Sequence, residues 1–358
     1  MKAGQGEFIL VINPGSTSTK VALFEGETER AKESIEHPSD LIAGFNHIYD
    51  QLPLRTMAVR SFLGRQGVDL SDLSCIMARG GILPPLRSGA YLVNEAMIDT
   101  LLHCPAQLHA SNLAALIADE LGRSAGIRSY IYDSVATDEL DAIARYSGAK
   151  ELPRRSFSHA LNTRAMCLRY AREYGANYAD LCLIAAHLGG GISVNAHKGG
   201  RIVDIVTGED GPFSTERAGA LPTMGLIELI RKEGPEKALA LERGKGGLAS
   251  YLGTNSAIEV EKRIDAGDAE AARVFEALAY QVAKAIGELA TVLKGEVDAI
   301  IVTGGMANSK RLTGWIAERV GFIAPVAVLP GEDEMRALAE GGLRLIRGQE
   351  KARVYGEE

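Results

Sequence analysis

Short apolar runs alternate with amphipathic stretches along the chain. The first run, residues 8–12, stops at Asn13-Pro14-Gly15, and a second run follows at residues 21–24. This spacing predicts a strand, a turn and a strand, with a third strand over residues 29–37. A tight hairpin needs only about two turn residues, so the polar side chains of residues 13–20 require a further explanation.

The next segments predict an α/β domain. Apolar residues at helical spacing indicate helices over residues 40–64 and 109–121. Between and after them, residues 75–78 and 129–132 are short apolar runs typical of buried strands. The first ends in Arg79-Gly80-Gly81 and the second delivers Asp133 at its carboxyl end. Such alternation implies a central sheet covered by helices.

The pattern then restarts. An apolar run at residues 180–186, the turn HLGGGIS and strands over 194–197 and 202–206 repeat the N-terminal order, with His187 in the place of Asn13 at an offset of 187 − 13 = 174. A long amphipathic helix over 268–294, a buried strand at 299–302 and a final helix near 332–347 follow. We expect one domain over residues 1–155, completed by a C-terminal helix at 335–358, and a second over 156–334, because 358 residues exceed one core.

Composition narrows the class of protein. Lys plus Arg number 39 and Asp plus Glu 46, so the net charge of 39 − 46 = −7 argues against nucleic acid as a partner. The four widely spaced cysteines suit reduced thiols, and no apolar run approaches the roughly 20 residues that span a bilayer. The first residues, MKAGQGEF, lack the apolar core of a signal peptide. We therefore expect a cytoplasmic protein with no membrane partner.

Three glycine-bearing turns follow apolar strands, at residues 13–20, 187–193 and 303–308. Glycines let backbone N–H groups approach an anion, and hydroxyl groups add donors. A nucleotide bound by two domains needs such turns at its phosphates and at its nucleoside, so the polar first turn is interpreted as facing phosphate. The segment RGKGG at residues 243–247 follows a charged helix and is interpreted as a loop.

The segments VINPGSTSTKVALF, ARGG, RSFSHALN, AHLGGGISV, GPFSTERAGALP, VTGGMANS and PGEDEMRALAEG resemble the acetokinase family over nearly the whole chain. This family belongs to the acetate and sugar kinase/heat-shock 70/actin (ASKHA) superfamily. The resemblance implies two actin-like, ribonuclease H-like α/β domains around a central cleft. It also implies transfer of the γ-phosphoryl group of ATP, with Mg²⁺, to a short-chain carboxylate, which gives an acyl phosphate and ADP.

The resemblance also implies site residues. The group expected at the reacting atoms is Asn13, Arg79, Asp133, His159 and Arg217. The residues expected to contact the nucleotide are Ser16, Ser18, Lys20, His187, Gly189, Gly190, Gly191, Gly304, Gly305 and Asn308. Glu334 is the expected metal-linked acid, with Asp333 or Glu332 as alternatives. Structural roles stay open for three of these positions: Asp133 as a helix cap, His159 as a cap or packing residue, and the acids as favourable charges at a helix N-terminus.

Several positions depart from the acetate kinase pattern. Pro14 replaces an alanine, Gly190 replaces an asparagine, and His159 is the one histidine where the family has two, so which of the two it replaces stays open. These departures and the shorter chain favour the butyrate and branched-chain branch, with an acetate or propionate kinase as the alternative. A non-catalytic nucleotide-binding module would lack the arginines, and a sugar kinase would need a catalytic aspartate. We also expect a homo-oligomer, a dimer or higher.

Overall fold

The computed structural model describes residues 6–105 and 108–357, so the first five residues of the segment MKAGQGEF lie outside the described part. The chain forms two compact units. Unit 1 contains the described residues up to Asp138 together with those from Asp333 onward, and unit 2 contains Glu139–Glu332. Within the described residues, no helix combines the length and the apolar character needed to cross a bilayer.

Unit 1 is built on a mixed sheet with the strand order β12-β5-β6-β4-β1-β2-β3. The strands are β1 (Phe8–Pro14), β2 (Ser18–Glu25), β3 (Thr28–Glu36), β4 (Leu73–Arg79), β5 (Ala90–Leu92), β6 (Ser129–Tyr132) and β12 (Arg353–Val354). β1 pairs antiparallel with β2 and parallel with β4, and β4 pairs parallel with β6. The predicted hairpin and the predicted strands at 75–78 and 129–132 are therefore confirmed.

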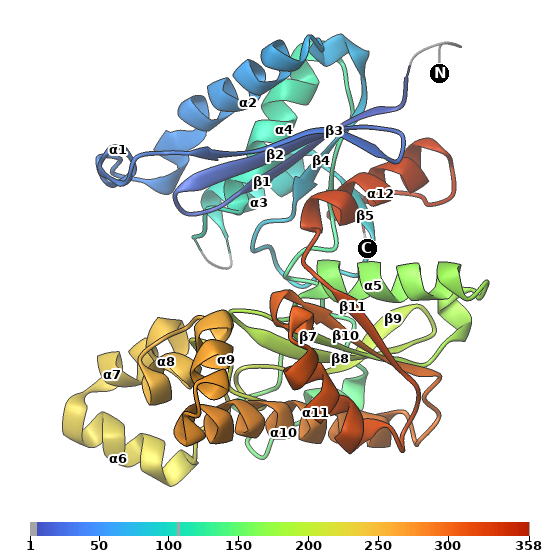
Figure 1. The fold of residues 1–358 in the computed structure, drawn as a ribbon. Coiled ribbons are helices and arrows are strands. Elements are labelled where there is room, and N and C mark those ends of the chain that lie inside the picture. The colour runs from blue at the N-terminus through green and yellow to red at the C-terminus, as the bar shows by residue number, and fades with distance from the viewer. Residues whose placement is uncertain (1–5, 106–107, 358) are drawn as a thin grey trace. The chain divides into compact units, whose positions relative to one another are not determined.

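Helices cover both faces of this sheet (Figure 1). On one face α2 (Leu52–Gln66) and α4 (Asn112–Ala125) pack on Leu10 and Ile12 of β1 in one apolar cluster. On the other face α12 (Glu334–Ile346) lies close to β1 and β4, where Gly342 sits against Ile9. Successive residues of a strand point to opposite faces, so β1 is buried on both sides and reads as a continuous apolar run.

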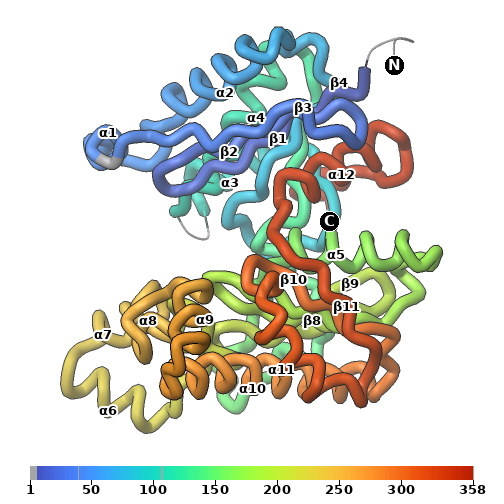
Figure 2. Tube along the Cα trace, in the orientation of Figure 1, coloured from blue at the N-terminus to red at the C-terminus, as the bar shows by residue number. Residues whose placement is uncertain are grey.

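Unit 2 has a sheet with the order β11-β10-β7-β8-β9. Its strands are β7 (Leu183–Leu188), β8 (Ile192–Lys198), β9 (Arg201–Val206), β10 (Ala299–Gly304) and β11 (Val326–Pro330). α5 (Ala160–Glu173) packs on one face through Cys167 and Tyr170, and α10 (Ala269–Val292) packs on the other through Phe275 and Val282 (Figure 2). Asp268 caps α10 by accepting hydrogen bonds from the N–H groups of residues 270 and 271, as its sequence predicts.

The remaining described helices lie outside these two layers. They are α1 (Ser39–Ala43), α3 (Glu95–His103), α6 (Thr223–Glu233), α7 (Pro235–Ala240), α8 (Gly247–Leu252), α9 (Ala257–Asp265) and α11 (Lys310–Val320), with short turns η1 (Ile48–Gln51), η2 (Leu70–Asp72), η3 (Ala142–Arg145), η4 (Tyr178–Asp180), η5 (Leu241–Lys245) and η6 (Gly305–Asn308).

The internal repeat is one of topology. The order β6-β4-β1-β2-β3 in unit 1 matches β11-β10-β7-β8-β9 in unit 2, strand for strand and with the same parallel and antiparallel pairings. The second strand of each hairpin has a register shift against the strand that follows it, at nearly equivalent places. The shift lies between Leu23 and Phe24 in β2 and between Ala196 and His197 in β8. The two hairpins belong to separate sheets, as the shape repeat in the sequence predicts.

The single helix predicted over residues 40–64 is wrong. The segment forms α1, the turn η1 and α2 instead. Gly44 ends α1, and His47 and Asp50 form a capping box that starts a new turn. Pro53 then stands in the first turn of α2, where its fixed φ and missing N–H favour a helix start over a helix interior.

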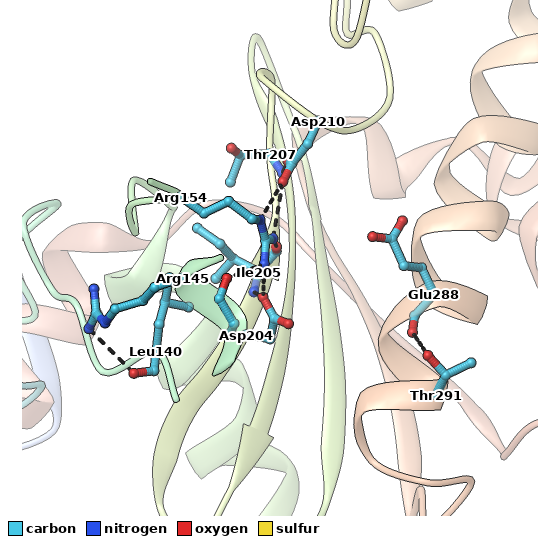
Figure 3. A network of polar contacts seen from close by, with 10 residues as sticks. Leu140, Arg145, Arg154, Asp204, Ile205, Thr207, Asp210, Glu288 and Thr291 are labelled. Carbon is cyan, nitrogen blue, oxygen red and sulfur yellow. Dashed lines mark hydrogen bonds and ion pairs between the residues drawn. The ribbon is translucent and has the colours of Figure 1, made fainter. Parts of the chain in front are cut away.

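Residues 139–155 belong to unit 2, earlier in the chain than the boundary expected near residue 155. Arg154 holds this segment to β9 and the loop that follows (Figure 3). Its guanidinium donates to Asp204 at 2.9 Å, to Asp210 at 3.0 Å and to the carbonyl of Ala144 at 2.7 Å. These contacts hold the segment that ends at Arg154 to the rest of unit 2.

Candidate active site

Three of the predicted residues meet at one edge of the unit 1 sheet. Ile12 pairs with Ala78 across the parallel strands β1 and β4, and Arg79 pairs with Tyr132 across β4 and β6. The residues that follow these strands therefore lie side by side, because parallel strands end at the same edge. This places Asn13, Arg79 and Asp133 at one edge of the sheet, and the family resemblance groups the same three residues at the reacting atoms.

Glu334, the first residue of α12, reaches the same edge. Its carboxylate accepts a hydrogen bond of 2.8 Å from the Asn13 amide and forms an ion pair with the Arg79 guanidinium. Asp333 caps α12 and pairs with Arg336, and Glu332 lies in unit 2. Of the three acids, Glu334 thus shares the Asn13 and Arg79 site. No cluster of three His, Cys, Asp or Glu side chains able to hold a metal occurs within residues 6–105 and 108–357.

Asp133 adopts a left-handed backbone conformation with φ of 40° and is 4% exposed. Its carboxylate accepts a 2.6 Å hydrogen bond from the N–H of Gly89, and its own N–H donates to the Gly89 carbonyl. Non-glycine residues in this region cost about 1–3 kcal/mol and gather at functional sites. Asp133 is therefore held by Gly89, the residue that precedes β5, and does not serve as a helix cap.

The polar hairpin turn presents two faces. Thr19 is buried on the face that α2 covers, whereas Ser18, Lys20 and Asn13 share the opposite face because they alternate with Thr19 or pair directly with Lys20. Ser16 and Lys20 are exposed and Ser18 is half-buried. The residues predicted to face phosphate are therefore accessible, next to the strand end that carries Asn13.

His187, at the end of β7, is buried and fixed on both ring nitrogens. Its Nδ1 lies 2.8 Å from the amide nitrogen of Asn162, and its Nε2 lies 3.0 Å from the carboxylate of Glu332. An amide nitrogen can only donate, so Nδ1 is the acceptor and Nε2 carries the proton. Asn162 was not predicted as a site residue, although it stands inside the RSFSHALN motif.

Asn162 is itself oriented by its second hydrogen bond. Its amide nitrogen donates to the Thr303 hydroxyl at 3.3 Å, and that hydroxyl donates to the carbonyl of Gly331 at 3.2 Å. An inverted Asn162 amide would face Thr303 with its oxygen, and the Thr303 hydroxyl could then donate to Asn162 only by giving up its hydrogen bond to Gly331. The chain from Gly331 through Thr303 and Asn162 therefore selects one tautomer of His187.

His159 stacks on His187, with ring centroids 3.9 Å apart and an interplanar angle of 12°. Its Nδ1 lies 3.0 Å from the Ser193 hydroxyl. A Cβ on Gly191 would come within 3.0 Å of the Arg217 guanidinium and 3.3 Å of the His159 ring. Glycine at this position therefore lets both groups flank one loop, and His159, Arg217 and the 187–191 turn form a single cluster.

The Arg217 loop rests on the RGKGG segment. Ser214 donates to the Gly190 carbonyl at 2.6 Å, which fixes the loop to the turn. From behind, Gly246 donates to the Glu216 carbonyl at 3.0 Å, and a Cβ on Gly247 would overlap the Ser214 carbonyl. Arg243 and Gly244 have non-helical backbone angles, so the segment forms a kinked connection before α8, and its glycines let it approach the arginine loop closely.

The third turn shows two different glycines. Gly304 has φ of 92° and a Cβ there would overlap the backbone of Leu188, so it is required for the fold of unit 2. Gly305 is exposed, and a Cβ there would meet no heavy atom within 4 Å. Asn308 is exposed and donates back to the Gly305 carbonyl at 2.9 Å. The open side of this turn is thus at Gly305 and Asn308.

Comparison with known structures identifies this fold. The crystal structure of Porphyromonas gingivalis acetate kinase matches with a TM-score of 0.77 at 19% identity, covering 95% of this chain and 100% of that one. A propionate kinase from Francisella tularensis matches with a TM-score of 0.74 at 18% identity, covering 94% and 98%. The fold is therefore that of the ASKHA kinases, two repeated α/β domains, as predicted.

The sequence decides the family. Residues 103–324 match the model of the acetokinase family. The chain is 49% identical to a probable butyrate kinase 2 of Caldanaerobacter subterraneus and 45% identical to butyrate kinase 2 of Clostridium acetobutylicum, each over 97% of this chain and 99% of the relative. The protein belongs to the acetokinase family.

The tautomer of His187 is open to a direct test. In Asn162→Asp a carboxylate accepts from Nδ1, and since Glu332 already accepts from Nε2 the ring becomes doubly protonated. We expect histidine ¹⁵N spectra to show an Nε2–H ring in the wild type and an imidazolium in the variant. Loss of an orienting partner of this kind costs about 10- to 100-fold in activity.

Asn177→Asp is the matched control, because Asn177 is an exposed helix cap of the same unit and aspartate caps equally well. It should leave both the His187 spectrum and kcat unchanged. An Nδ1–H ring in the wild-type spectrum would contradict the assigned hydrogen-bond chain.

Proposed function

We propose that the protein transfers the γ-phosphoryl group of ATP reversibly to a short-chain carboxylic acid, with butyrate or a branched acid of similar size as the preferred acceptor. The observation that carries this proposal is the near-full-length similarity, at 45–49% identity, to proteins named butyrate kinase. The geometry of the predicted site residues within each unit supports it in three respects.

The first is that a carboxylate acceptor needs no general base, and the hairpin offers none at Asn13. A carboxylic acid of this kind has a pKa near that of a side-chain carboxyl, about 4, so it is already ionised at neutral pH. At the strand end the chain has the neutral Asn13, whose amide is a donor to a carboxylate, Glu334. This suits an anionic acceptor, whereas an alcohol acceptor would require removal of a proton.

The second is the distribution of arginines. A carboxylate and a phosphoryl group repel each other, and arginine forks neutralise such groups while keeping their charge. Arg79 already holds the carboxylate of Glu334, which shows that its position accommodates a carboxylate. In unit 2 the exposed Arg217 guanidinium lies at Gly191, where it is available to a transferred phosphoryl group.

The third is the protonated face of His187. With Nε2–H as donor and Glu332 as its acceptor, His187 offers a neutral hydrogen bond to an oxyanion. The turn backbone at Gly189 lies beside this donor, since a Cβ there would be 2.6 Å from the Glu332 carboxylate and 3.0 Å from Nε2. An anionic oxygen therefore already occupies the position at which we place a phosphoryl oxygen.

Kinases of this family use ATP or ADP together with a divalent metal ion. The carboxylates of Glu334 and Asp333 are hard oxygen donors that suit Mg²⁺, and we assign Glu334 as the metal-linked acid. When bound, the ion neutralises phosphate charge during transfer. Nucleotide binding at Gly305 and Asn308 is supported by the open space around Gly305.

We further infer a cytoplasmic enzyme that acts as a homo-oligomer. Cys75 and Cys167 are buried and unpaired with other cysteines, and burial raises the pKa of the Cys75 thiol to about 12. Such inert thiols suit a reducing compartment.

The acceptor preference can be measured by hydroxamate detection of acyl phosphate across straight and branched acids of two to six carbons. Each buried methylene contributes about 0.8 kcal/mol, so kcat/KM should rise in steps from acetate to butyrate and fall for longer acids. Acetate or propionate as the best acceptor would instead assign the alternative, an acetate or propionate kinase.

Arg217 is expected to act on the transition state. Arg217→Ala should lower kcat by about two to three orders of magnitude, as for loss of one oxyanion donor. Arg217→Lys should recover part of the rate, because lysine restores charge without the planar fork. Arg231→Ala, an exposed arginine at the end of α6, serves as control. A lowered Tm with normal kcat for the folded protein would assign Arg217 a structural role.

The proposed position of the nucleotide can be tested by adding a methyl group at Gly305. Gly305→Ala adds a methyl group into open space, so Tm should stay constant while the Kd for ADP rises roughly tenfold through steric conflict with the ligand. Gly314→Ala, inside α11 and equally unhindered, should leave the Kd unchanged and raise Tm slightly, because alanine favours a helix interior over glycine. An unchanged Kd for Gly305→Ala would show that the adenosine binds elsewhere. Gly304→Ala is uninformative because it disturbs β10 and Leu188.

A further inference from the structure

Beneath the polar hairpin turn lies a buried cation. Arg55, on α2, has a relative exposure of 0%, which is unusual because arginine is rarely fully buried without a charged partner. Among the ion pairs of the described residues none involves Arg55, and burial lowers the pKa of this guanidinium. Its neighbour His37 also has a lowered pKa, through burial and through the Arg55 charge, and so is a neutral partner.

The guanidinium uses all of its N–H groups on the turn and on one glutamine. It donates to the carbonyl of Ser18 at 2.7 Å, to the carbonyl of Ser16 at 2.9 Å and to the hydroxyl of Thr19 at 3.1 Å. Its remaining donors go to the amide oxygen of Gln51 at 2.9 and 3.0 Å. Every acceptor is neutral, so the hydrogen bonds are satisfied but the charge is not compensated.

This charge lies behind the candidate phosphate face. Thr19 points toward α2, and Ser18 and Lys20 point to the other side of the hairpin. α2 lies over β2 in Figure 1. By drawing the carbonyls of Ser16 and Ser18 toward itself, the guanidinium keeps these partial negative charges on the α2 side of the turn. The opposite side carries the Ser18 hydroxyl, the Lys20 ammonium and the Asn13 amide. Its carboxylates belong to Glu36, which pairs with Ser18, and to Glu334, which accepts from Asn13.

The second hairpin shows that bracing alone does not require a charge. Its turn is held by a neutral contact, in which the Ser214 hydroxyl donates to the Gly190 carbonyl at 2.6 Å. The same strand–turn–strand topology is thus fixed in unit 2 by a serine. Burying an arginine without a carboxylate is costly, so a cation in the equivalent place of unit 1 implies an effect beyond holding the turn.

We propose that Arg55 is a positioning residue that gives the Ser16–Thr19 turn its affinity for a phosphoryl group, by fixing the turn backbone and by placing an uncompensated positive charge behind it. The bound phosphoryl group then compensates the buried charge. This inference rests on the proposed function for the identity of the ligand. It goes beyond it in assigning anion affinity to a residue of α2 that never touches the ligand.

The decisive comparison is Arg55→Met against Arg60→Met. Both arginines lie on α2, but Arg60 is exposed and donates a hydrogen bond of 3.1 Å to the Ser124 hydroxyl. A unit charge held a short distance behind a partly solvated site changes affinity by about tenfold or more. We therefore expect Arg55→Met to raise the Kd for ATP and the KM for acyl phosphate at least tenfold, and to flatten their salt dependence. Arg60→Met should match the wild type.

Thermal shift measurements with sulfate as the probe distinguish a purely structural role of Arg55 from a role in anion affinity. Wild type should gain Tm with rising sulfate and Arg55→Met should not, whatever its Tm without the anion. A lowered Tm with an unchanged sulfate response and unchanged KM would show that Arg55 is only a brace and would overturn the proposal.

Two further variants keep the test decisive if Arg55→Met does not fold. Arg55→Lys retains the charge with fewer hydrogen bonds, and Gln51→Met frees the guanidinium while leaving its charge in place. Both should keep part of the sulfate response and show intermediate KM values. Wild-type responses from both would contradict the inference. Failure of the wild type to form any acyl phosphate would refute the proposed function alone, because the sulfate response is read without turnover.

Discussion

Parallel pairing is the constraint on which the predicted site residues of each unit depend: β1 with β4 and β4 with β6 in unit 1, and β7 with β10 and β10 with β11 in unit 2. Each set of strands ends at one edge, so side chains far apart in sequence become neighbours without any dedicated contact. Asn13, Arg79 and Asp133 meet in this way in unit 1. The same pairing brings His187 and Thr303 together in unit 2.

The acidic segment at residues 332–334 supplies one carboxylate to the strand ends of each unit. Glu332 follows β11 and accepts from His187, and Glu334 begins α12 and binds Arg79 and Asn13. Two groups predicted to bind anions thus each hold a carboxylate. Since carboxylate and phosphoryl oxygens are recognised by the same donors, these contacts are physical evidence that the two positions suit anionic ligands. They also mean that a ligand must exchange places with, or bind beside, an acid.

Packing behind the site controls the polar groups in front of it. Arg55 draws turn carbonyls to the α2 side, Asn162 fixes the tautomer of His187, and the close approach of Gly247 supports the Arg217 loop. None of these residues carries the predicted chemistry itself. Each contacts or supports a predicted site residue or its loop, so the predicted site residues depend on buried partners as well as on their own exposed groups.

The sequence by itself determined the local elements and the class of protein. Periodicity predicted the hairpin, the buried strands and the capped helix α10, because these depend on residues close together in the chain. Its motifs identified the family and the positions of Asn13, Arg79 and Glu334. It misjudged residues 40–64, where a capping box and Pro53 interrupt a helical spacing that apolar residues alone suggest. The tertiary structure alone decided that Glu334 binds Arg79, that Asn162 orients His187 and that Arg55 is buried without an opposing charge. These facts depend on partners tens to hundreds of residues away, and no local pattern of hydrophobic and polar positions encodes which distant side chain will fill a given hydrogen bond.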